Sequence, residues 1–437
     1  MHTIEPLAWY GALIGLFIAI AFILKKINPV YSLFLGAILG AVIGGGNLEQ
    51  IIGLLTSGTQ SVMGTVIRVL AAGVLAGVMM ESGAAETIAQ AIVRKMGESK
   101  AILALTLATM IITAVGVFIP VAVLIVAPIA LSVGNKMGIS KLALLLALSG
   151  GGKAGNIVSP NPNTIAAANG FHLNLSDVMI ADFIPAVFGL IITVVVASML
   201  KNKGIMVSGE EAAAAYGTQS AKNDKTYPTL GKAIVAPAVA VILLMINPIG
   251  SIFHISALTP FKLDAMYVLP IAGIVGLIAM GQKHKVITYT ASGLEKMTAT
   301  VLILIGAGAI AGLIAASNLS AQVVQLINVM GISGTFLAPI SGILMAAATA
   351  STSTGTILAT GTFGNAIATI GIAPIASAVM VHTGATVIDS LPQGNYFHVT
   401  VQSMNMTIRQ RMDLLPYEAI VGGTMTLVAT VLYGLIL

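Results

Sequence analysis

The sequence predicts an all-α polytopic membrane protein with about ten transmembrane helices and two re-entrant hairpins in two inverted-topology repeats. Of the 437 residues, 57% are hydrophobic and only 8% are charged, so the chain cannot cover a water-facing surface with polar side chains. Apolar runs of roughly 17 to 25 residues, long enough to cross a bilayer, recur along nearly the whole length. Polar breaks rich in glycine or in serine and threonine interrupt these runs at matching places in the two halves.

Basic residues at the ends of the apolar runs predict the topology of the first half, because cytoplasmic loops are enriched in Lys and Arg. The first helix, about residues 6–24, ends at Lys25 and Lys26, which places the N-terminus outside. It has no preceding Lys or Arg and no small-residue cleavage site, so we interpret it as a retained helix rather than a signal peptide. The following predictions are crossings over 31–45 and 61–80, an amphipathic surface segment over 84–96, a hairpin with arms 101–118 and 121–133, a crossing broken at 149–164, and a helix over 183–200.

Residues 201–232 form the only long hydrophilic segment, which we predict to be a cytoplasmic linker. The chain therefore divides into an N-terminal repeat (1–200), the linker (201–232) and a C-terminal inverted repeat (233–437). The second half is predicted to contain helices over 233–246 and 266–280, a long helix ending near 317, an external amphipathic segment over 320–330, a hairpin with arms 335–347 and 357–370, a broken crossing over 374–403, and a final helix over 417–437. The C-terminus is then outside as well. In this frame every one of the 20 Lys and Arg residues is cytoplasmic except Arg68, Lys153, Lys262 and Lys296.

The two halves also resemble each other in sequence. Tyr31 matches Tyr267 and Gly138 matches Gly371 at nearly the same spacing, and further matches between these pairs show that the spacing drifts slowly and regularly. Each half has five predicted crossings. Because five is an odd number, the second half must be inverted relative to the first, as in many secondary transporters.

Four polar breaks lie within the predicted membrane segments. An unwound backbone in hydrocarbon leaves amide groups unsatisfied at several kcal/mol each, so it persists only where protein or a hydrated cavity satisfies it. Paired helix ends supply backbone amides for an anion and carbonyl groups for a cation. The breaks therefore predict one central site for a carboxylate and a coupling ion, H⁺ or Na⁺. They are Gly116–Pro120, Ser149–Thr164, Ala348–Thr356 and His382–Asn395.

The break at 149–164 combines glycines, which allow close backbone approach, with two prolines, which oppose a helix. Its only charge, Lys153, is a candidate partner for a substrate carboxylate. The alternative is a polar external loop in which Lys153 reaches a lipid headgroup. The candidate substrate-binding residues here are Lys153, Asn156, Ser159, Asn161, Asn163 and Thr164.

The second half contributes Asp389 as the candidate coupling carboxylate, because ionisable groups at membrane depth are costly and usually functional. Ser390 and Thr356 are candidates for the same ion site. Alternatively, Asp389 caps a helix on the cytoplasmic side, and the Ser and Thr run only satisfies helix backbones. The further substrate-binding candidates are Ser351, Thr352, Ser353, Thr354, Gln393 and Asn395.

Three other polar residues admit a structural and a functional interpretation. Arg68 pairs either with a substrate carboxylate or structurally, with Glu81 or Asp389. His382 and His398 either titrate in a proton pathway or are packing residues. The sequence has no cysteine, no spaced cluster of His and acidic residues and no P-loop, so we predict neither a metal site nor a cofactor.

Two segments carry a resemblance to a known family. VSPNPNTIAAANGF (Val158 to Phe171) and VIDS (Val387 to Ser390) resemble stretches of the gluconate permease family, the gluconate:H⁺ symporters of the ion transporter superfamily. Serine replaces the first proline of the family stretch, and Asn161 stands where a His is often found. The resemblance implies alternating-access symport of H⁺ or Na⁺ with gluconate, a related sugar acid or a short hydroxy acid.

The alternative function is a Na⁺/H⁺ antiporter without an organic substrate, in which Asp389 and Glu81 exchange the ions. No acid pair or metal motif marks a reaction centre, so we do not expect an enzyme. The expected partners are a small organic anion and membrane lipid, with a homodimer as one possible assembly. The basic residues lie in short loops, which argues against nucleic-acid binding, and we expect a bacterial inner-membrane location.

Overall fold

The structure is a computed structural model, and it describes residues 6–97, 100–213, 227–252, 255, 257–258, 263–319, 321–322, 325, 329, 334–392 and 394–436. Within these residues the regular secondary structure is helical, and two isolated bridges, Leu7–Ser317 and Ser140–Met206, are the only pairings of the β type. The predicted all-α class is confirmed.

Most helices of the first half follow the predicted apolar runs, but α3 over Leu48–Ser61 lies where no helix was predicted. The predicted amphipathic segment is helix α5, whose exposed Arg94 and Lys95 lie in its last turn. The first hairpin consists of α6 and α7, which join through Gly116 at a positive φ of 98°. The bounds are α1 Trp9–Leu24, α2 Pro29–Ile43, α3 Leu48–Ser61, α4 Met63–Glu81, α5 Ala84–Met96, α6 Ala101–Ala114, α7 Ile119–Met137, α8 Lys141–Ile157, α9 Pro162–Gly170, α10 Leu175–Ala181 and α11 Phe183–Met199.

The second half has one long helix, α16, where the first half has α3 and α4. The predicted amphipathic segment over 320–330 lies outside the described residues, apart from positions 321, 322, 325 and 329. The bounds are α13 Leu230–Ala233, α14 Val235–Ile252, α15 Ala265–Ala279, η2 Lys283–Lys285, α16 Val286–Ala315, η3 Gly334–Phe336, α18 Leu337–Thr349, α19 Thr352–Thr369, α20 Pro374–Gly384, α21 Asn395–Ser403, α22 Ile408–Met412, α23 Leu415–Ala429 and the π-helical η4 Thr430–Ile436.

The break predicted over 149–164 is wrong in its first half. Helix α8 continues to Ile157, and the chain leaves helical geometry only over 158–161. The glycines there serve helix packing: a Cβ on Gly151 would lie 2.2 Å from the carbonyl oxygen of Thr106, and one on Gly155 would lie 2.0 Å from that of Met110. Small residues thus let the α6 and α8 backbones touch, which is a common device for packing membrane helices.

The other breaks are also shorter than predicted. Helix α20 continues through His382 to Gly384, so the second broken helix is interrupted only over 385–394. In the second hairpin, α18 ends at Thr349, Ala350 adopts a left-handed conformation with φ 48°, and Ser351 caps α19 through a hydrogen bond from the Thr354 amide. Helix propensity therefore holds closer to each tip than the run of hydroxyl residues suggested.

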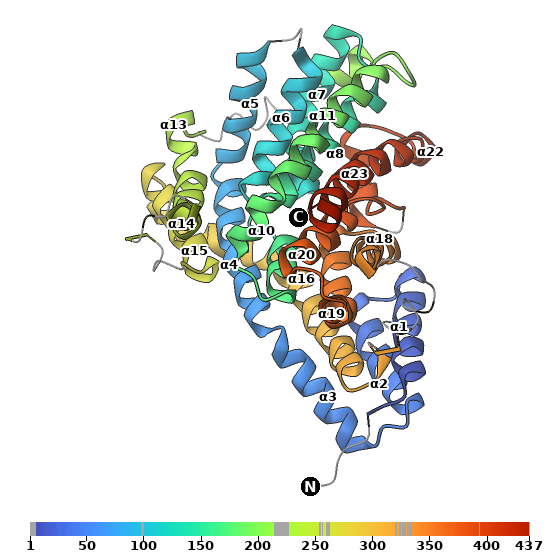
Figure 1. Cartoon of the computed structure of the whole chain (residues 1–437). Coiled ribbons are helices and arrows are strands. Elements are labelled where there is room, and N and C mark those ends of the chain that lie inside the picture. The colour runs from blue at the N-terminus through green and yellow to red at the C-terminus, as the bar shows by residue number, and fades with distance from the viewer. Residues whose placement is uncertain are drawn as a thin grey trace.

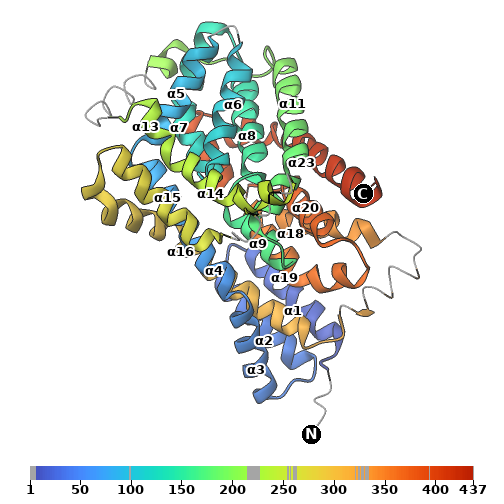
Figure 2. The same ribbon diagram turned by 60° about the vertical axis from the view of Figure 1, so that its left-hand side comes forward.

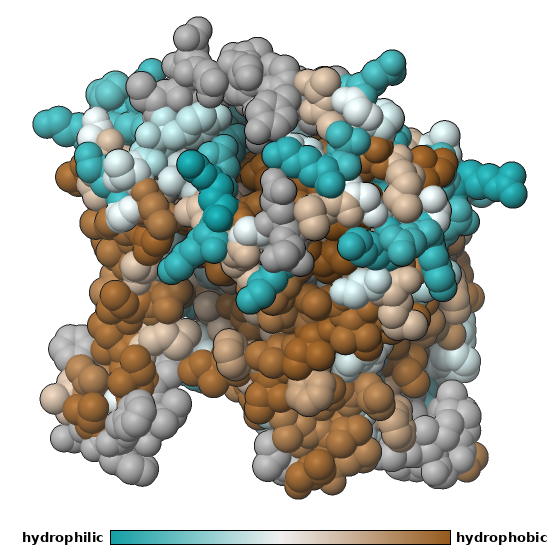
Figure 3. Space-filling model, turned by 90° about the horizontal axis from the view of Figure 1, so that it is seen from above, coloured by the Kyte–Doolittle hydropathy of each residue, from teal (hydrophilic) through white to brown (hydrophobic). Residues whose placement is uncertain are grey.

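Apolar helices of membrane-spanning length occur in both halves. By length and composition alone, 5 described helices are long enough to cross a membrane, or 6 if the bent pair α10–α11, with its 42° bend, counts as one. Shorter apolar helices of 10–17 residues, including α1, α2, α6 and α15, accompany them. Seen from the end of the molecule at the top of Figure 1, hydrophilic side chains gather over one part of the surface and hydrophobic ones over the rest (Figure 3). This surface is that of a chain whose solvent includes lipid.

The backbone of the second half matches that of the first at the spacing found in the sequence. Helices α2 and α15, α6 and α18, α7 and α19, α9 and α21, and α11 and α23 begin at corresponding positions. Residues with a left-handed backbone conformation also lie at this spacing in the two halves. In one pair, His172 and Asn405, neither residue is glycine, and few such residues adopt this conformation. The pairs are Gly45 with Gly281, Gly116 with Ala350, Gly138 with Gly371, and His172 with Asn405.

The two halves interlock. The α1–α2 pair packs against α16 of the second half, while the α14–α15 pair packs against α4 of the first. Figures 1 and 2 show α3, α4 and α5 following one another along the length of the molecule, with α16 crossing its middle. Glycines again mediate the closest contact: a Cβ on Gly293 of α16 would lie 2.0 Å from the Gly73 carbonyl oxygen of α4.

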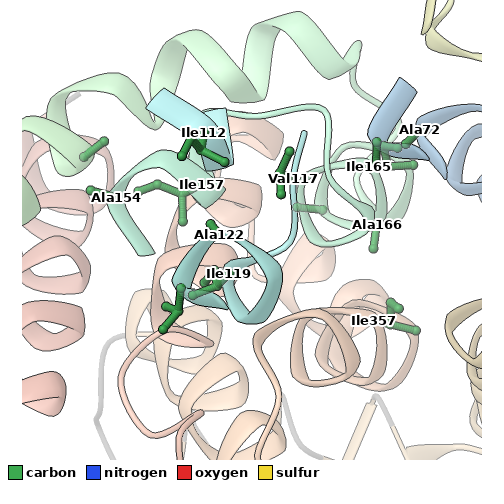
Figure 4. Packing of buried hydrophobic residues seen from close by; sticks show 14 of the residues in the cluster. Ala72, Ile112, Val117, Ile119, Ala122, Ala154, Ile157, Ile165, Ala166 and Ile357 are labelled. Carbon is green, nitrogen blue, oxygen red and sulfur yellow. The ribbon is translucent and has the colours of Figure 1, made fainter. Parts of the chain in front are cut away.

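An apolar core surrounds the broken helices (Figure 4). Ile112 of α6, Ile119 of α7 and Ile157 of α8 are buried together, and Ile165 of α9 lies near α4 and α19. This packing fixes the polar ends of α7, α8, α9 and α19 relative to one another.

The start of the linker is attached to the first half and to the second. The Ser140 amide donates to the Lys201 carbonyl, and Lys141 contacts both the Glu211 carboxylate and the Asn405 carbonyl. Partial burial acts to raise the pKa of Glu211, but hydrogen bonds from Lys141 and Ser208 outweigh it and hold that pKa below its usual value. Lys141 therefore joins the linker to both halves.

Candidate functional site

Lys153 and Asp389 form a buried ion pair at the centre of the molecule. The Lys153 ammonium lies 2.6 Å from the Asp389 carboxylate and 2.6 Å from the Thr386 carbonyl oxygen. The side chains are 1% and 5% exposed. The two partners are 236 and 233 residues from Lys153, so Lys153 contacts the counterpart of its own segment in the other half. The loop and snorkelling interpretation of Lys153 is wrong, because α8 carries the residue into the core.

The remaining contacts of Asp389 come from hydroxyl groups. Thr352, in the first turn of α19, donates to one carboxylate oxygen at 2.6 Å, and Ser390 donates to the other at 2.8 Å. Asp389 is in the 385–394 break, where no helical ladder fixes its backbone. The carboxylate is therefore held by one cation and two hydroxyls, each from a side chain that can rotate.

A polar cavity of about 260 Å³ lies beside this pair. Its wall includes residues from all four breaks, which sequence reasoning placed around one site. Asp389 opens onto it, together with the tip of α6–α7, the end of α8 and the starts of α19 and α21. The lining residues are Phe118, Ile119, Pro120, Asn156, Thr300, Ala350, Ser351, Thr352, Ser353, Thr354, Asp389, Asn395 and Tyr396.

Helices α7, α19 and α21 all begin at this cavity, at Ile119, Thr352 and Asn395. The first turn of a helix has unpaired amide groups and a partial positive charge. Three such ends on one cavity favour a bound anion, and the ammonium of Lys153 offsets the negative charge of Asp389 on its wall.

The candidate residues around the end of α8 have two roles. One lines the cavity, and others donate hydrogen bonds to the backbone. Asn156 lines the cavity, and its side-chain oxygen accepts from the Asn161 amide at 2.5 Å. Ser159 and Thr164 both donate to the Asn156 carbonyl and close the turn rather than face the cavity. They satisfy the free carbonyl at the helix end.

The candidates of the second half divide in the same way. Ser351 to Thr354 and Asn395 line the cavity. Thr356 donates to the Thr352 carbonyl inside α19, so its observed contact is with the helix backbone and not with Asp389. Gln393 lies outside the described residues.

A second buried polar chain leads away from the cavity. Ser353 lies 3.4 Å from the Asn163 side-chain oxygen, the Asn163 amide nitrogen lies 2.7 Å from His382 Nε2, and His382 Nδ1 lies 2.7 Å from an Asp182 oxygen. His382 and Asp182 are both 0% exposed. Asp182, between α10 and α11, was not identified from the sequence, although a lone acid between two apolar segments is a signal that could have found it.

A third buried cluster joins α8, α22 and α23. Arg411 donates to both oxygens of Glu418, at 2.8 Å and 3.0 Å, and Ser149 also donates to Glu418. Arg411 further donates to Thr400 and stacks near the Phe397 ring. Sequence reasoning placed Arg411 in a cytoplasmic loop and missed this pair.

The two structural partners predicted for Arg68, Glu81 and Asp389, are wrong. Its guanidinium contacts the Asp264 carboxylate through both Nε and Nη2, at 2.6 Å to 3.1 Å. Glu81 pairs instead with Lys296 at 2.8 Å. Asp264 caps α15, so the Arg68 pair ties α14–α15 to α4 at the wall of a separate cavity of about 170 Å³. His398, the other candidate, is exposed and contacts the Pro392 carbonyl.

A larger cavity of about 390 Å³ lies between α3, α9, α16 and α19. Its polar lining includes Thr65, Asn169, His172 and Asn365. Helix α19 borders both this cavity and the one at Asp389, through Thr360 and Thr352 respectively. Among the described residues, no group of three or more His, Cys, Asp and Glu side chains is placed to hold a metal ion.

A model of the GntP family permeases matches residues 7–436. The chain belongs to this family. A transporter of Haemophilus influenzae is 46% identical over 424 residues, with 97% of each chain covered. The gluconate permease of Zymomonas mobilis is 23% identical with 98% of each chain covered, and the D-serine transporter DsdX of Escherichia coli is 24% identical with 78% of each covered.

Solved structures of two transporters share the fold of this GntP family permease. The YdaH transporter of Alcanivorax borkumensis has a TM-score of 0.64 at 14% identity, with 89% of this chain and 90% of that chain covered. MtrF of Neisseria gonorrhoeae has a TM-score of 0.62 at 17% identity, with 89% and 84% covered. The resemblance inferred from two short segments is therefore confirmed, and this GntP family permease is a multi-pass membrane transporter and not an enzyme.

Proposed function

We propose that this permease is a secondary active transporter that moves a small hydroxy-carboxylate together with a cation, H⁺ or Na⁺. The observation that carries the proposal is that Asp389, on the wall of this cavity, pairs with the buried ammonium of Lys153 behind it. When Asp389 moves aside, the cation that holds this carboxylate can hold that of a substrate, and three helix ends favour the same charge.

The relatives support a carboxylate class. Gluconate and D-serine, named in two of them, both carry a carboxylate next to a carbon with a polar substituent. Asn156, Asn395 and the hydroxyls of Ser351 to Thr354 supply donors and acceptors for such a substituent and for further hydroxyl groups. We therefore propose gluconate, a related sugar acid or a short hydroxy acid as substrate.

Coupling follows from competition for Lys153. When the substrate carboxylate takes the ammonium, Asp389 is left with hydroxyl donors only, and a buried carboxylate without a cation is costly. Asp389 then takes up a proton, or Na⁺ held also by hydroxyl oxygens of Ser390 and Thr352. Substrate and cation occupy the site together, which is the requirement for symport.

Alternating access would use the two halves as inverted repeats of five crossings each. The shared helix order, the left-handed residues at the same offset and the contact of Lys153 with its counterpart segment support a two-fold relation about this site. We further propose a bacterial inner-membrane location, with both termini outside.

Counterflow in proteoliposomes tests substrate binding by Lys153. Vesicles loaded with unlabelled D-gluconate or D-serine should take up the labelled compound with the wild-type protein, and Lys153→Met should lower this exchange at least about tenfold. Lys296→Met is the matched control, because its ion pair with Glu81 is partly exposed and neither residue lines the cavity. Wild-type rates in Lys153→Met would contradict the proposal. Na⁺ or H⁺ flux without any organic anion would instead identify an antiporter.

A further inference from the structure

We propose that His382 and Asp182 form a second proton-binding site, and that Asn163 and Ser353 transmit its charge state to the substrate cavity. The consequence for substrate binding rests on the proposed function, whereas the proton site itself does not. The site is separate from the Lys153–Asp389 pair.

The hydrogen-bond chain sets the state of the neutral site. Asn163 donates its amide N–H to His382 Nε2, so Nε2 is the acceptor and Nδ1 carries the hydrogen that Asp182 accepts. The Asn163 oxygen then accepts from the Ser353 hydroxyl, which lies on the cavity wall. In this state the Ser353 hydrogen points away from the cavity.

Protonation reverses these directions. A proton that binds the lone pair of Nε2 turns that atom into a donor, so the Asn163 amide must present its oxygen to His382 by rotating half a turn. Its NH₂ group then faces Ser353 and donates to the hydroxyl oxygen. The Ser353 hydrogen is released toward the cavity, where a substrate carboxylate or hydroxyl oxygen can accept it.

The cluster of Ser149, Arg411 and Glu418, which also joins the two halves, shows a carboxylate with a fixed cationic partner. His382 stands at the repeat counterpart of Ser149, and Glu418 lies within about one helical turn of the counterpart of Asp182, so the two carboxylates occupy related places. Both oxygens of Glu418 are bonded to Arg411, which keeps its charge at any physiological pH. In contrast, Asp182 Oδ1 is buried and has no hydrogen-bond partner among the described residues, and its partner is a side chain that gains and loses a proton readily.

No other described charge competes for His382. Helix α20 packs against α9, α10, α18, α19, α23 and η4. Besides Asp182, the titratable or charged groups on these elements and next to them are Asp177, Glu418 with Arg411, Lys153 with Asp389, Tyr433, whose hydroxyl donates to the Ala181 carbonyl, and the exposed or partly exposed His172, Asp413 and Tyr417. Asp177 is partly exposed on α10. In the Glu418–Arg411 and Lys153–Asp389 pairs, each charge is neutralised by its partner.

Nuclear magnetic resonance of the histidine rings tests the proton site without any substrate. Protein labelled with ¹⁵N-histidine is placed in lipid vesicles, and the signals lost in His382→Gln identify that ring among the 6 histidines. Between about pH 8 and pH 5, the range in which histidines titrate, Nε2 should change from bare to protonated while Nδ1 keeps its hydrogen. In Asp182→Asn the ring should stay neutral over this range. Unchanged His382 signals in the wild type, or a hydrogen on Nε2 at the higher pH, would overturn the proposal.

Uptake measurements test the relay. Acidification should increase the apparent affinity for D-gluconate or D-serine in uptake. This increase should be at least about fivefold larger in the wild type than in Asn163→Leu or Ser353→Ala. The control variant, His398→Gln, should behave as the wild type. Equal pH dependence in Asn163→Leu and in the wild type would refute the relay. If the wild type carries neither compound, the proposed substrate class fails, and the resonance experiment still decides the proton site.

Discussion

Removing one member of the Lys153–Asp389 pair should cost at least as much stability as removing both. Asp389→Leu leaves an ammonium that is 1% exposed with only the Thr386 carbonyl as partner, and Lys153→Met leaves a carboxylate with two hydroxyl donors. Breaking a buried ion pair in this way costs about 3–5 kcal/mol. The double variant removes both charges and should lose no more than either single variant, so the coupling energy should be at least about 3 kcal/mol.

The assay is unfolding of the four proteins in mixed micelles with increasing fractions of SDS. The control cycle uses Lys296→Met and Glu81→Leu, a pair with side chains 37% and 31% exposed, for which we expect a coupling energy of about 0–1 kcal/mol. If the losses of the two single variants at the central pair simply add in the double variant, the pair is not the buried, mutually neutralising unit described above.

Two further predictions concern packing and the linker. Gly155→Ala should destabilise the protein by about 1–3 kcal/mol, because the new Cβ would overlap the Met110 carbonyl, whereas Gly53→Ala, with open space around it, should not; equal unfolding midpoints would contradict this. Glu211→Gln should lower stability by about 0.2–1 kcal/mol at neutral pH. Since the Lys141 contact lowers the pKa of Glu211, this contribution is present above its usual value of 4.5 and is lost as the pH falls through the folded-state pKa; a pH-independent difference in thermal unfolding would refute it.

The helices and their order could be predicted from the sequence because apolar length and basic ends are local signals. The bounds of α5 at Ala84–Met96 follow from amphipathic spacing alone. The glycines of α8 could not be interpreted locally, since a glycine that permits unwinding and one that permits close packing are the same residue in a sequence. Only the position of α6 shows that Gly155 packs.

The sequence predicted individual residues of the candidate site but not the contact between Lys153 and Asp389. Lys153 and Asp389 were both selected as buried charges, yet their contact depends on how the two halves fold together. At the offset of 233 residues that relates the broken helices, the counterpart of Lys153 is Thr386, three residues before Asp389, so a two-fold axis through these helices would have suggested the contact. Asp264 was not selected, because a helix-capping acid at a membrane edge looks like an ordinary loop residue.

Dependence of substrate accumulation on Asp389 is the most direct test of the proposed symport. Purified wild-type protein in proteoliposomes, supplied with an inward gradient of H⁺ or Na⁺, should concentrate labelled D-gluconate or D-serine above the external level. Asp389→Asn should let the compound equilibrate without concentrating it. The neutral amide carries no charge that needs a proton or Na⁺ when the substrate carboxylate binds Lys153. Concentrative uptake by Asp389→Asn equal to that of the wild type would contradict the coupling role of this carboxylate.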